Sequence, residues 1–325
     1  QAIADYMSRQ YGLDLTANMT IATNGGKQGL YNLIQCLVDP GDEALIPAPY
    51  WVSYPEMVKM AQGTPVPVRT SFADQFKMTA EQLREHITPN TKALILCSPS
   101  NPTGTCYTLR ELKEIAAVLK EYPDILIFSD EIYEYIVFNG EHVSILNAAP
   151  ELKDRTVLIN GFSKGFAMTG WRLGYAAGPK PVINALAKIQ SQETSAPSSI
   201  SQKAGLAAYT GTMAPVARMK EAFLERRDYM VKALNEIDGV DCFTPSGAFY
   251  LFPDIRSFLG RSTPGGTEIK TSTDLCLYLL EEHGVAAVPG DAFGEPGGLR
   301  MSYASSMEQL KEAVQRLKNG FDALN

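Results

Sequence analysis

The chain has 325 residues, of which 45% are hydrophobic, and its 36 acidic and 29 basic residues give a formal net charge of −7. This length exceeds what one hydrophobic core normally supports, so we expect a large domain and a smaller one. The acidic balance argues against nucleic-acid binding, which needs clustered Lys and Arg, and the lack of an apolar run of about 18 residues argues against a membrane-spanning helix.

The N-terminal stretch, QAIADYMSRQYG, is polar with a helical period and does not resemble a signal peptide. It begins without Met and in the middle of a helical pattern. We therefore expect that the protein has a further N-terminal segment preceding this sequence.

Short runs of β-branched and aliphatic residues, each ending at turn residues, recur through the first half of the chain. They predict strands within residues 19–26, 42–49, 64–70, 92–104, 125–133, 156–164 and 172–178. Amphipathic helical patterns lie between several of these runs, for example one with an apolar stripe of Leu109, Leu112, Ile115, Ala116 and Leu119. The alternation predicts an α/β fold with a mostly parallel sheet flanked by helices, whose ligands bind at the carboxyl ends of the strands.

The pattern changes near residue 212. A long helical segment is followed by short strands and two further helices, predicted at 213–237, 240–245, 248–255, 271–284, 285–290, 299–304 and from Met307 onward. This part is typical of a smaller α+β unit. We therefore expect a large domain at residues 1–212 and a small C-terminal domain at residues 213–325.

The cysteines give no sign of a disulfide framework or a zinc site. They are odd in number, widely scattered and without C-x-x-C spacing near histidines: Cys36, Cys97, Cys106, Cys242 and Cys276. A reducing, cytoplasmic compartment fits this usage, and we expect no metal.

The segment NGFSKGFAMTGWRLGY, residues 160–175, contains two candidate nucleophiles side by side. Its GFSKG fits the G-x-S-x-G elbow of serine hydrolases, which would make Ser163 the nucleophile. Such a triad needs a downstream base, and only His283 qualifies, with Asp254 or Asp274 as the acid. The residues after GFSKG are poor material for the helix that an elbow requires.

Lys164, beside Ser163, suits a different chemistry. A lysine that forms imines with carbonyls serves pyridoxal phosphate (PLP) enzymes, which also need a carboxylate for the ring nitrogen and donors for the phosphate. Asp130 follows an apolar strand and fits the carboxylate, although a helix cap is the alternative. Gly25 and Gly26 stand between a strand and a helix, where free N–H groups favour a phosphate, although an ordinary turn also explains the pair.

The same segment, NGFSKGFAMTGWRLGY, resembles the cofactor-lysine signature of class I, fold-type I PLP-dependent aminotransferases. The segments APYWVSYPE, SPSNPTG, SDEIYE and GLRMSYA resemble other signatures of this family, in the family's order. The resemblance extends over nearly the whole chain. It is strongest to the bacterial aspartate/prephenate aminotransferase branch, which carries GGKQ and PYWVSYPE as this sequence does.

The resemblance implies catalytic roles for three residues at strand ends. Lys164 holds PLP covalently and moves a proton between the substrate's α-carbon and the cofactor. Asp130 keeps the ring nitrogen protonated, and Tyr133 donates to the cofactor's phenolic oxygen. Taken alone, Tyr133 would be an ordinary aromatic residue at a strand end.

Other positions match the family's cofactor and substrate contacts. Asn101 is expected to bond the phenolic oxygen and the substrate carboxylate, and its bond to the following proline is expected to be cis. Trp51 matches the aromatic residue that stacks on the ring, with core packing as the alternative. Arg172 and the backbone N–H of Gly26 match the phosphate site, and Arg300 matches the bidentate partner of the α-carboxylate.

Lys27 indicates the substrate class. At this position other branches carry a small residue that contacts the phosphate, whereas the aspartate/prephenate branch carries a lysine for the substrate's distal carboxylate. The sequence departs from the family at Gly161, where many relatives have a hydroxyl on the phosphate. The family's N-terminal segment, which carries part of the small domain and a tyrosine for the neighbouring subunit's phosphate, is also absent from this chain.

The resemblance thus implies a PLP-dependent aminotransferase that moves the amino group of aspartate to 2-oxoglutarate, and also to prephenate, in ping-pong half-reactions. Its expected partners are small-molecule amino acids and 2-oxo acids and a second copy of the chain in a homodimer. Two alternatives stay open: an aromatic or alanine aminotransferase or a PLP β-lyase of the same fold, and a non-catalytic PLP-binding regulatory domain. No helix-turn-helix or basic segment supports the last of these.

Overall fold

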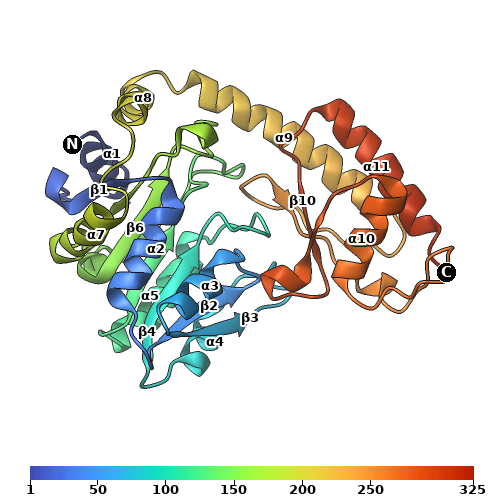
Figure 1. Ribbon diagram of the computed structural model, residues 1–325, viewed down its shortest axis with the longest axis horizontal. Helices are drawn as coiled ribbons and strands as arrows, with labels where there is room; N and C mark the ends of the chain where they lie inside the picture. The colour runs from blue at the N-terminus through green and yellow to red at the C-terminus, as the bar shows by residue number, and fades with distance from the viewer.

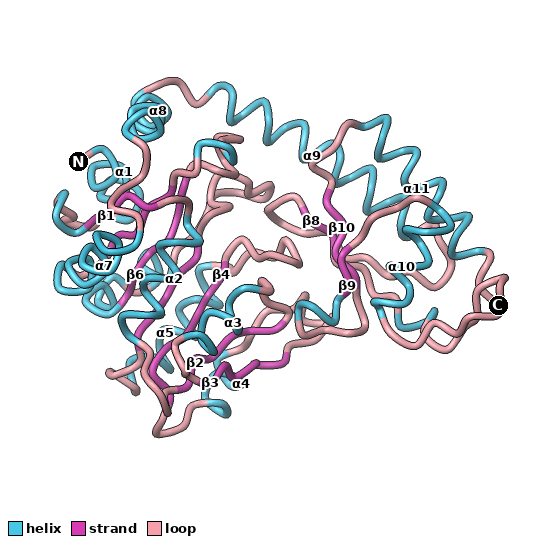
Figure 2. The backbone as a smooth tube through the Cα atoms, in the orientation of Figure 1, coloured by secondary structure: helices cyan, strands magenta, loops and turns pink.

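The computed structural model describes residues 1–325, with a large sheet and a small sheet connected by a long helix (Figures 1 and 2). The large sheet has seven strands in the order β1-β7-β6-β5-β4-β2-β3. Only β7 runs opposite to the others, so the sheet is mostly parallel, as predicted. The strands are β1 (Thr20–Thr23), β2 (Glu43–Ala48), β3 (Thr64–Arg69), β4 (Thr91–Cys97), β5 (Leu126–Asp130), β6 (Thr156–Gly161) and β7 (Gly174–Ala177).

Helices cover both faces of this sheet because successive strand residues point to opposite sides. In β4, Leu94 and Leu96 belong to one core and Ala93 and Ile95 to the other. The first core is covered by α1 (Ala2–Tyr11), α4 (Ala80–His86), α5 (Leu109–Glu121), α6 (Ile145–Ala148) and the end of α8 (Ser199–Thr210). The second is covered by α2 (Gly26–Leu37), α3 (Ser53–Met60) and α7 (Lys180–Glu193).

Helix α5 shows where the predicted apolar stripe begins. A capping box formed by Thr108 and Glu111 starts the helix, so Leu109 occupies its first turn. Leu109 is 43% exposed, whereas the other four residues of the stripe are buried. The prediction that Leu109 belongs to the buried stripe is therefore wrong, because the cap places it outside the sheet contact.

The C-terminal part forms the small sheet, with the strand order β8-β10-β9 and helices packed against it. Its elements are α9 (Ala214–Asn235), β8 (Tyr250–Leu251), α10 (Ser272–His283), β9 (Val288–Pro289), β10 (Leu299–Ser302) and α11 (Met307–Asp322). The strand predicted at 240–245 is absent. There the Asn235 side chain bonds both the N–H and the carbonyl of Cys242, which satisfies that backbone without a neighbouring strand.

Two features of the whole structure bear on function. None of its helices combines the length and apolar character needed to cross a membrane. No group of three or more His, Cys, Asp or Glu side chains is arranged to hold a metal ion, and all five cysteines are free.

The first residue of β7, Gly174, lies where three strand ends meet. It pairs with Thr23 of β1 on one side and with Gly161 of β6 on the other. A Cβ atom at position 174 would stand 2.5 Å from the carbonyl carbon of Gly25. Only glycine allows this approach, which sets the position of the turn before α2.

We expect Gly174→Ala to displace that turn and to cost about 1–3 kcal/mol of stability, as overpacking of a close contact does. A lower melting temperature in a thermal unfolding experiment would show it. The matched control is Gly170→Ala, because an added Cβ at Gly170 meets no atom within 4 Å. Equal melting temperatures for the two variants would contradict the prediction.

Candidate active site

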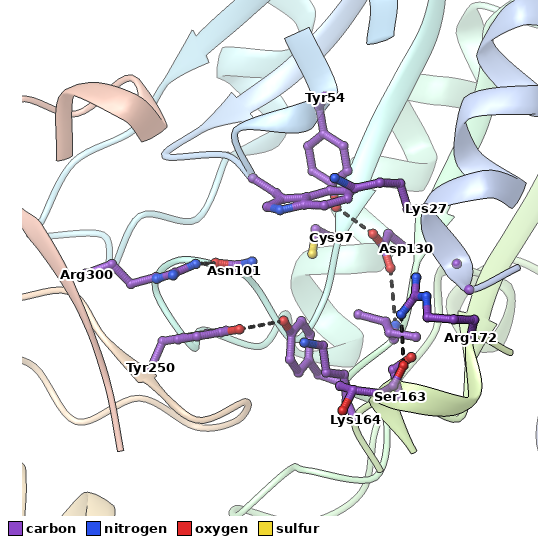
Figure 3. A pocket seen from close by; sticks show the side chains of 16 residues that line it. Lys27, Tyr54, Cys97, Asn101, Asp130, Ser163, Lys164, Arg172, Tyr250 and Arg300 are labelled. Carbon is purple, nitrogen blue, oxygen red and sulfur yellow. Dashed lines mark hydrogen bonds between the residues drawn. The ribbon is translucent and has the colours of Figure 1, made fainter. Parts of the chain in front are cut away.

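One cavity lies at the carboxyl ends of the parallel strands and is closed on the other side by residues of the small sheet (Figure 3). Its volume is about 330 Å³ and sixteen residues line it. All ten residues that the sequence assigned to the site are among them: Gly25, Gly26, Lys27, Trp51, Asn101, Asp130, Tyr133, Lys164, Arg172 and Arg300. Side chains from strand ends spread along the chain therefore meet in one place.

The Asp130 carboxylate lies at the end of β5 and is 6% exposed. The Tyr54 hydroxyl donates to Oδ2 at 2.7 Å, and the Ile132 N–H donates to Oδ1 at 3.2 Å. Burial raises the pKa of Asp130 to about 6, although both hydrogen bonds act to lower it. A buried carboxylate with fixed donors is suited to accept a hydrogen bond from a cationic ring nitrogen.

Lys164 lies in the turn after β6 and its amine faces the same cavity (Figure 3). Burial lowers the pKa of Lys164, and the positive charges of Arg300 and Arg172 lower it further, whereas Asp130 acts in the opposite direction. The amine is therefore shifted toward the neutral form, which is the form that attacks a carbonyl carbon.

One end of the cavity is built for an anion. Helix α2 begins at Gly26, and its N-cap residue Gly25 has a φ of 78°, a conformation that favours glycine. The Arg172 guanidinium covers this turn so closely that a Cβ on Gly25 would stand 2.6 Å from Nη2. Free N–H groups, the helix dipole and the guanidinium together fit a phosphate group.

The structure explains why this chain has glycine at position 161, where many relatives have a hydroxyl-bearing residue. A Cβ at this position would stand 2.8 Å from the Cα of Gly174, so no hydroxyl-bearing side chain fits there. Ser163 and Thr169 instead line the cavity, and the Thr169 carbonyl accepts a hydrogen bond from Arg172 Nη1 at 3.0 Å. Two hydroxyl-bearing residues thus line the same cavity.

The opposite end carries Arg300. Its Nη1 donates to Asn101 Oδ1 at 3.0 Å, and its guanidinium carbon lies 4.6 Å from the Tyr250 ring centroid and 5.1 Å from that of Phe293. The buried Nε has no hydrogen-bond partner in the protein. A planar guanidinium, bracketed by two rings and with an unused donor, fits a carboxylate. The Asn101–Pro102 peptide bond is cis, as predicted.

A further cation stands at the rim of the cavity. Lys27, in the first turn of α2, places Nζ 4.7 Å from the centroid of the Trp51 ring. The Trp51 ring meets Tyr54 edge-on, with centroids 5.3 Å apart. The half-buried indole therefore lines the cavity and also packs against the core that α2, α3 and α7 cover.

Sequence reasoning missed several lining residues, of which Tyr54 and Tyr250 matter most. Tyr54 lies in the quoted PYWVSYPE segment, three residues after Trp51, whose carbonyl accepts a hydrogen bond from the Tyr54 N–H at 3.0 Å at the start of α3. The Tyr250 hydroxyl lies 2.9 Å from that of Tyr133 across the two sheets, and no local pattern indicates this pair. The missed residues are Tyr54, Cys97, Ile132, Thr169 and Tyr250, and Ser163 was considered only as a hydrolase nucleophile.

The structure does not assemble a serine-hydrolase triad. No histidine lines the cavity that contains Ser163. His283 lies at the end of α10 in the small domain, with Nε2 2.9 Å from the Tyr278 hydroxyl. The serine interpretation of GFSKG is therefore wrong, and Lys164 stays the predicted reactive residue of that segment.

Comparison with known proteins agrees with this fold and cavity. The family model "Aminotransferase class I and II" matches residues 1–317. The aspartate/prephenate aminotransferase of Nitrosomonas europaea is 47% identical over 320 residues, which covers 98% of this chain and 80% of that protein. The aspartate aminotransferase of Geobacillus stearothermophilus is 47% identical over 324 residues, covering 99% and 81%.

Solved structures give the same result. The crystal structure of the aspartate aminotransferase from Rhizobium meliloti has a TM-score of 0.96 at 44% identity and covers 100% of this chain and 81% of that one. The fold and cavity therefore define a PLP-dependent enzyme. The chain belongs to the class I and II aminotransferase family, whose members use PLP as cofactor.

The aromatic bracket around Arg300 generates a prediction. We expect Phe293→Leu to raise the KM for the amino-acid substrate by about tenfold with a small change in kcat, because a desolvated cation–π contact contributes about 1–2 kcal/mol. Steady-state kinetics measures both constants. Phe258→Leu is the control, since Phe258 is equally buried but packs on Phe321 in the small-domain core. A KM increase of the same size in both variants would contradict a specific role of the bracket.

Proposed function

We propose that this chain is an aspartate aminotransferase that converts L-aspartate and 2-oxoglutarate into oxaloacetate and L-glutamate, with prephenate as a further amino-group acceptor that gives arogenate. One observation carries the proposal: Lys164 and Asp130 share a cavity with cations at both ends, Arg172 at one and Arg300 at the other. The substrates named for the relatives agree with it.

The cofactor, when bound, supplies an aldehyde carbon that joins amino groups covalently and a ring that takes up electrons. The protein supplies the groups that hold and move protons. Lys164 Nζ, kept toward its neutral form by burial and by neighbouring cations, would accept the proton that leaves the substrate's α-carbon and release it again later in the same half-reaction.

Asp130, Tyr133 and Asn101 would hold the cofactor's ring in the charge state that the reaction needs. Asp130, oriented by the Tyr54 hydroxyl, would accept a hydrogen bond from the protonated ring nitrogen of the cofactor. Tyr133, whose hydroxyl is 2.9 Å from that of Tyr250, donates toward the phenolic oxygen together with Asn101. The N-terminus of α2 and Arg172 bind the phosphate, which holds the ring in register with these groups.

The substrate is oriented by its two carboxylates. Arg300 and Asn101 bind the α-carboxylate, so that the α-hydrogen points at Lys164. Lys27, at the rim beside Trp51, pairs with the distal carboxylate of aspartate or glutamate. In the first half-reaction aspartate gives its amino group to the cofactor and is released as oxaloacetate. In the second an oxo acid, bound by the same residues, receives that amino group.

We further propose that the chain has two domains, forms a homodimer and is located in the cytoplasm. The division into residues 1–212 and 213–325 is supported by a C-terminal core whose buried members, apart from Tyr133 and Ile136, all follow the start of α9. A homodimer is supported by exposed apolar side chains, among them Trp171, which precedes Arg172, and Ile200 on α8. Five free cysteines support a cytoplasmic location.

The covalent prediction concerns Lys164. We expect borohydride treatment of the PLP-loaded protein to fix the cofactor on this residue, because its amine is the one placed beside Asp130 in the cavity. Peptide mass mapping locates the label. Lys164→Ala should bind PLP without being labelled, and a label on another lysine of the wild-type protein would refute the assignment.

Lys27 tests the substrate class. We expect Lys27→Ala to raise the KM for aspartate about tenfold or more, since a hydrogen bond to a charged group contributes about 1.5–3 kcal/mol, and to leave alanine turnover nearly unchanged. The control is Lys59→Ala, because Lys59 pairs with Glu56 on the surface of α3. A panel of amino donors and oxo acids, including prephenate, gives the readout.

The same panel separates the rival functions. Unchanged aspartate turnover in Lys27→Ala, together with dominant aromatic or alanine substrates, would favour those aminotransferases. Release of pyruvate and ammonia from β-substituted amino acids would identify a PLP β-lyase. A regulatory domain would bind PLP and turn over none of the donors.

A further inference from the structure

The turn after β5 presents two sets of side chains in opposite directions. Asp130 and Tyr133 line the cavity, whereas Glu131 and Glu134 are buried on the side away from it. These two carboxyl groups are 1% and 6% exposed. The proposed mechanism uses the first set only, so the buried acids need an explanation of their own.

The Glu131 carboxylate is surrounded by four hydrogen-bond partners. The hydroxyls of Ser129 and Ser144 donate to Oε1 at 2.8 and 2.6 Å. The Tyr11 hydroxyl donates to Oε2 at 2.6 Å, and His142 Nε2 lies 3.0 Å from the same oxygen. The partners belong to β5, the N-cap of α6, helix α1 and the loop between β5 and α6. One carboxylate thus ties four segments together.

The charges in this cluster compensate one another. Burial acts to raise the pKa of Glu131, but the charge of His142 and the hydrogen bonds outweigh it and the pKa is lowered. Burial acts to lower the pKa of His142, but the Glu131 carboxylate outweighs it and the pKa is raised. The two therefore form a buried ion pair, and removing one partner leaves an uncompensated charge.

Glu134 sits beside this pair as a carboxyl group that is easily protonated. Its Oε2 lies 3.2 Å from the Tyr11 hydroxyl, whose single proton bonds Glu131, and its Oε1 has no partner. Burial, with the charge of Glu131, raises the pKa of Glu134 to about 7. The titratable groups that face the two acids from the surrounding elements are Tyr6, Tyr11, Tyr135, His142, Tyr175 and Tyr209.

The cluster is rigidly linked to the catalytic side chains. The Glu131 N–H donates to the Ile159 carbonyl of β6 at 2.9 Å, and the Asp130 carbonyl accepts from the Ser98 N–H at 3.2 Å. Consecutive Cα atoms are about 3.8 Å apart, so a shift of Glu131 moves Asp130 directly. Tyr135, in the same turn, also packs directly against the backbone next to Lys164. Its ring leaves no room for a Cβ on Gly165, the residue after Lys164.

We propose that Glu131, held by His142 and Tyr11, is a positioning residue for the PLP site. It fixes the end of β5 so that Asp130 and Tyr133 stay aligned with the cofactor, and it couples helix α1 to the active site although neither Glu131 nor α1 touches the cavity. This inference rests on the proposed function, since it assigns Glu131 a role only in a PLP enzyme.

The test compares the PLP-loaded wild-type protein with Glu131→Gln and Tyr11→Phe. In Glu131→Gln we expect kcat to fall about 100-fold, because misplacing catalytic groups by about 1 Å costs that much, with little change in KM. The readout beyond activity is a pH titration of the bound cofactor's absorbance without substrate. Removal of the negative charge should lower its midpoint by about half a pH unit or more.

Tyr11→Phe keeps the carboxylate and removes one donor. The negative charge of Glu131 then lacks one hydrogen-bond donor, so it should raise the pH midpoint of the cofactor's absorbance, opposite to the effect of Glu131→Gln. We expect kcat to fall by a smaller factor than in Glu131→Gln. This variant also keeps the proposal testable if Glu131→Gln does not fold. Glu111→Gln is the control, because Glu111 pairs with Lys77 at the start of α5, away from the cavity; its midpoint and kcat should equal those of the wild type.

The outcomes separate this inference from the proposed function. Midpoint shifts of opposite sign with a loss of kcat support a positioning role. A lower melting temperature with unchanged midpoint and unchanged kcat in the variants would show that Glu131 only stabilises the fold and would overturn the inference. Absence of PLP binding or of aspartate turnover in the wild-type protein would instead refute the proposed function.

Discussion

The structure depends on placing an ionisable carboxyl group, that of Asp130, in the interior at the end of the central strand. Burial alone favours its neutral form, so the surrounding residues must compensate. The Tyr54 hydroxyl, the Ile132 N–H and the Lys164 charge all do so. The same burial shifts Lys164 toward its neutral amine. Burial thus favours the neutral amine at Lys164, whereas Asp130 needs its hydrogen-bond donors and nearby positive charge to stay ionised.

The chain meets this constraint by using both sides of one short turn. On the cavity side the turn presents Asp130 and Tyr133. On the interior side Glu131 bonds His142 and Tyr11, which hold the turn in place. A buried ion pair adds little net stability compared with apolar packing, but it holds a specific geometry. In this protein that geometry is the orientation of a strand end.

Much of the fold was predictable from sequence because apolar runs typical of strands alternate with helical patterns. Asp130 and Lys164 lie at the ends of such runs, whereas Arg300 lies within β10 and was assigned only through the resemblance to the aminotransferase family. The failures have physical causes: a capping box exposed Leu109, and an Asn235 side chain replaced a strand at Cys242. Contacts such as Tyr11 with Glu131, which are 120 residues apart, leave no local pattern.

The hydrogen bond between Arg300 and Asn101 connects the two sheets, because one residue lies on β10 and the other follows β4. A ligand carboxylate held by this pair would act as a latch between the two lobes. Amide-exchange protection along α9, the helix that joins the lobes in Figure 1, would then increase when a dicarboxylate is added. Substrate recognition and the connection between the two lobes would then depend on the same two side chains.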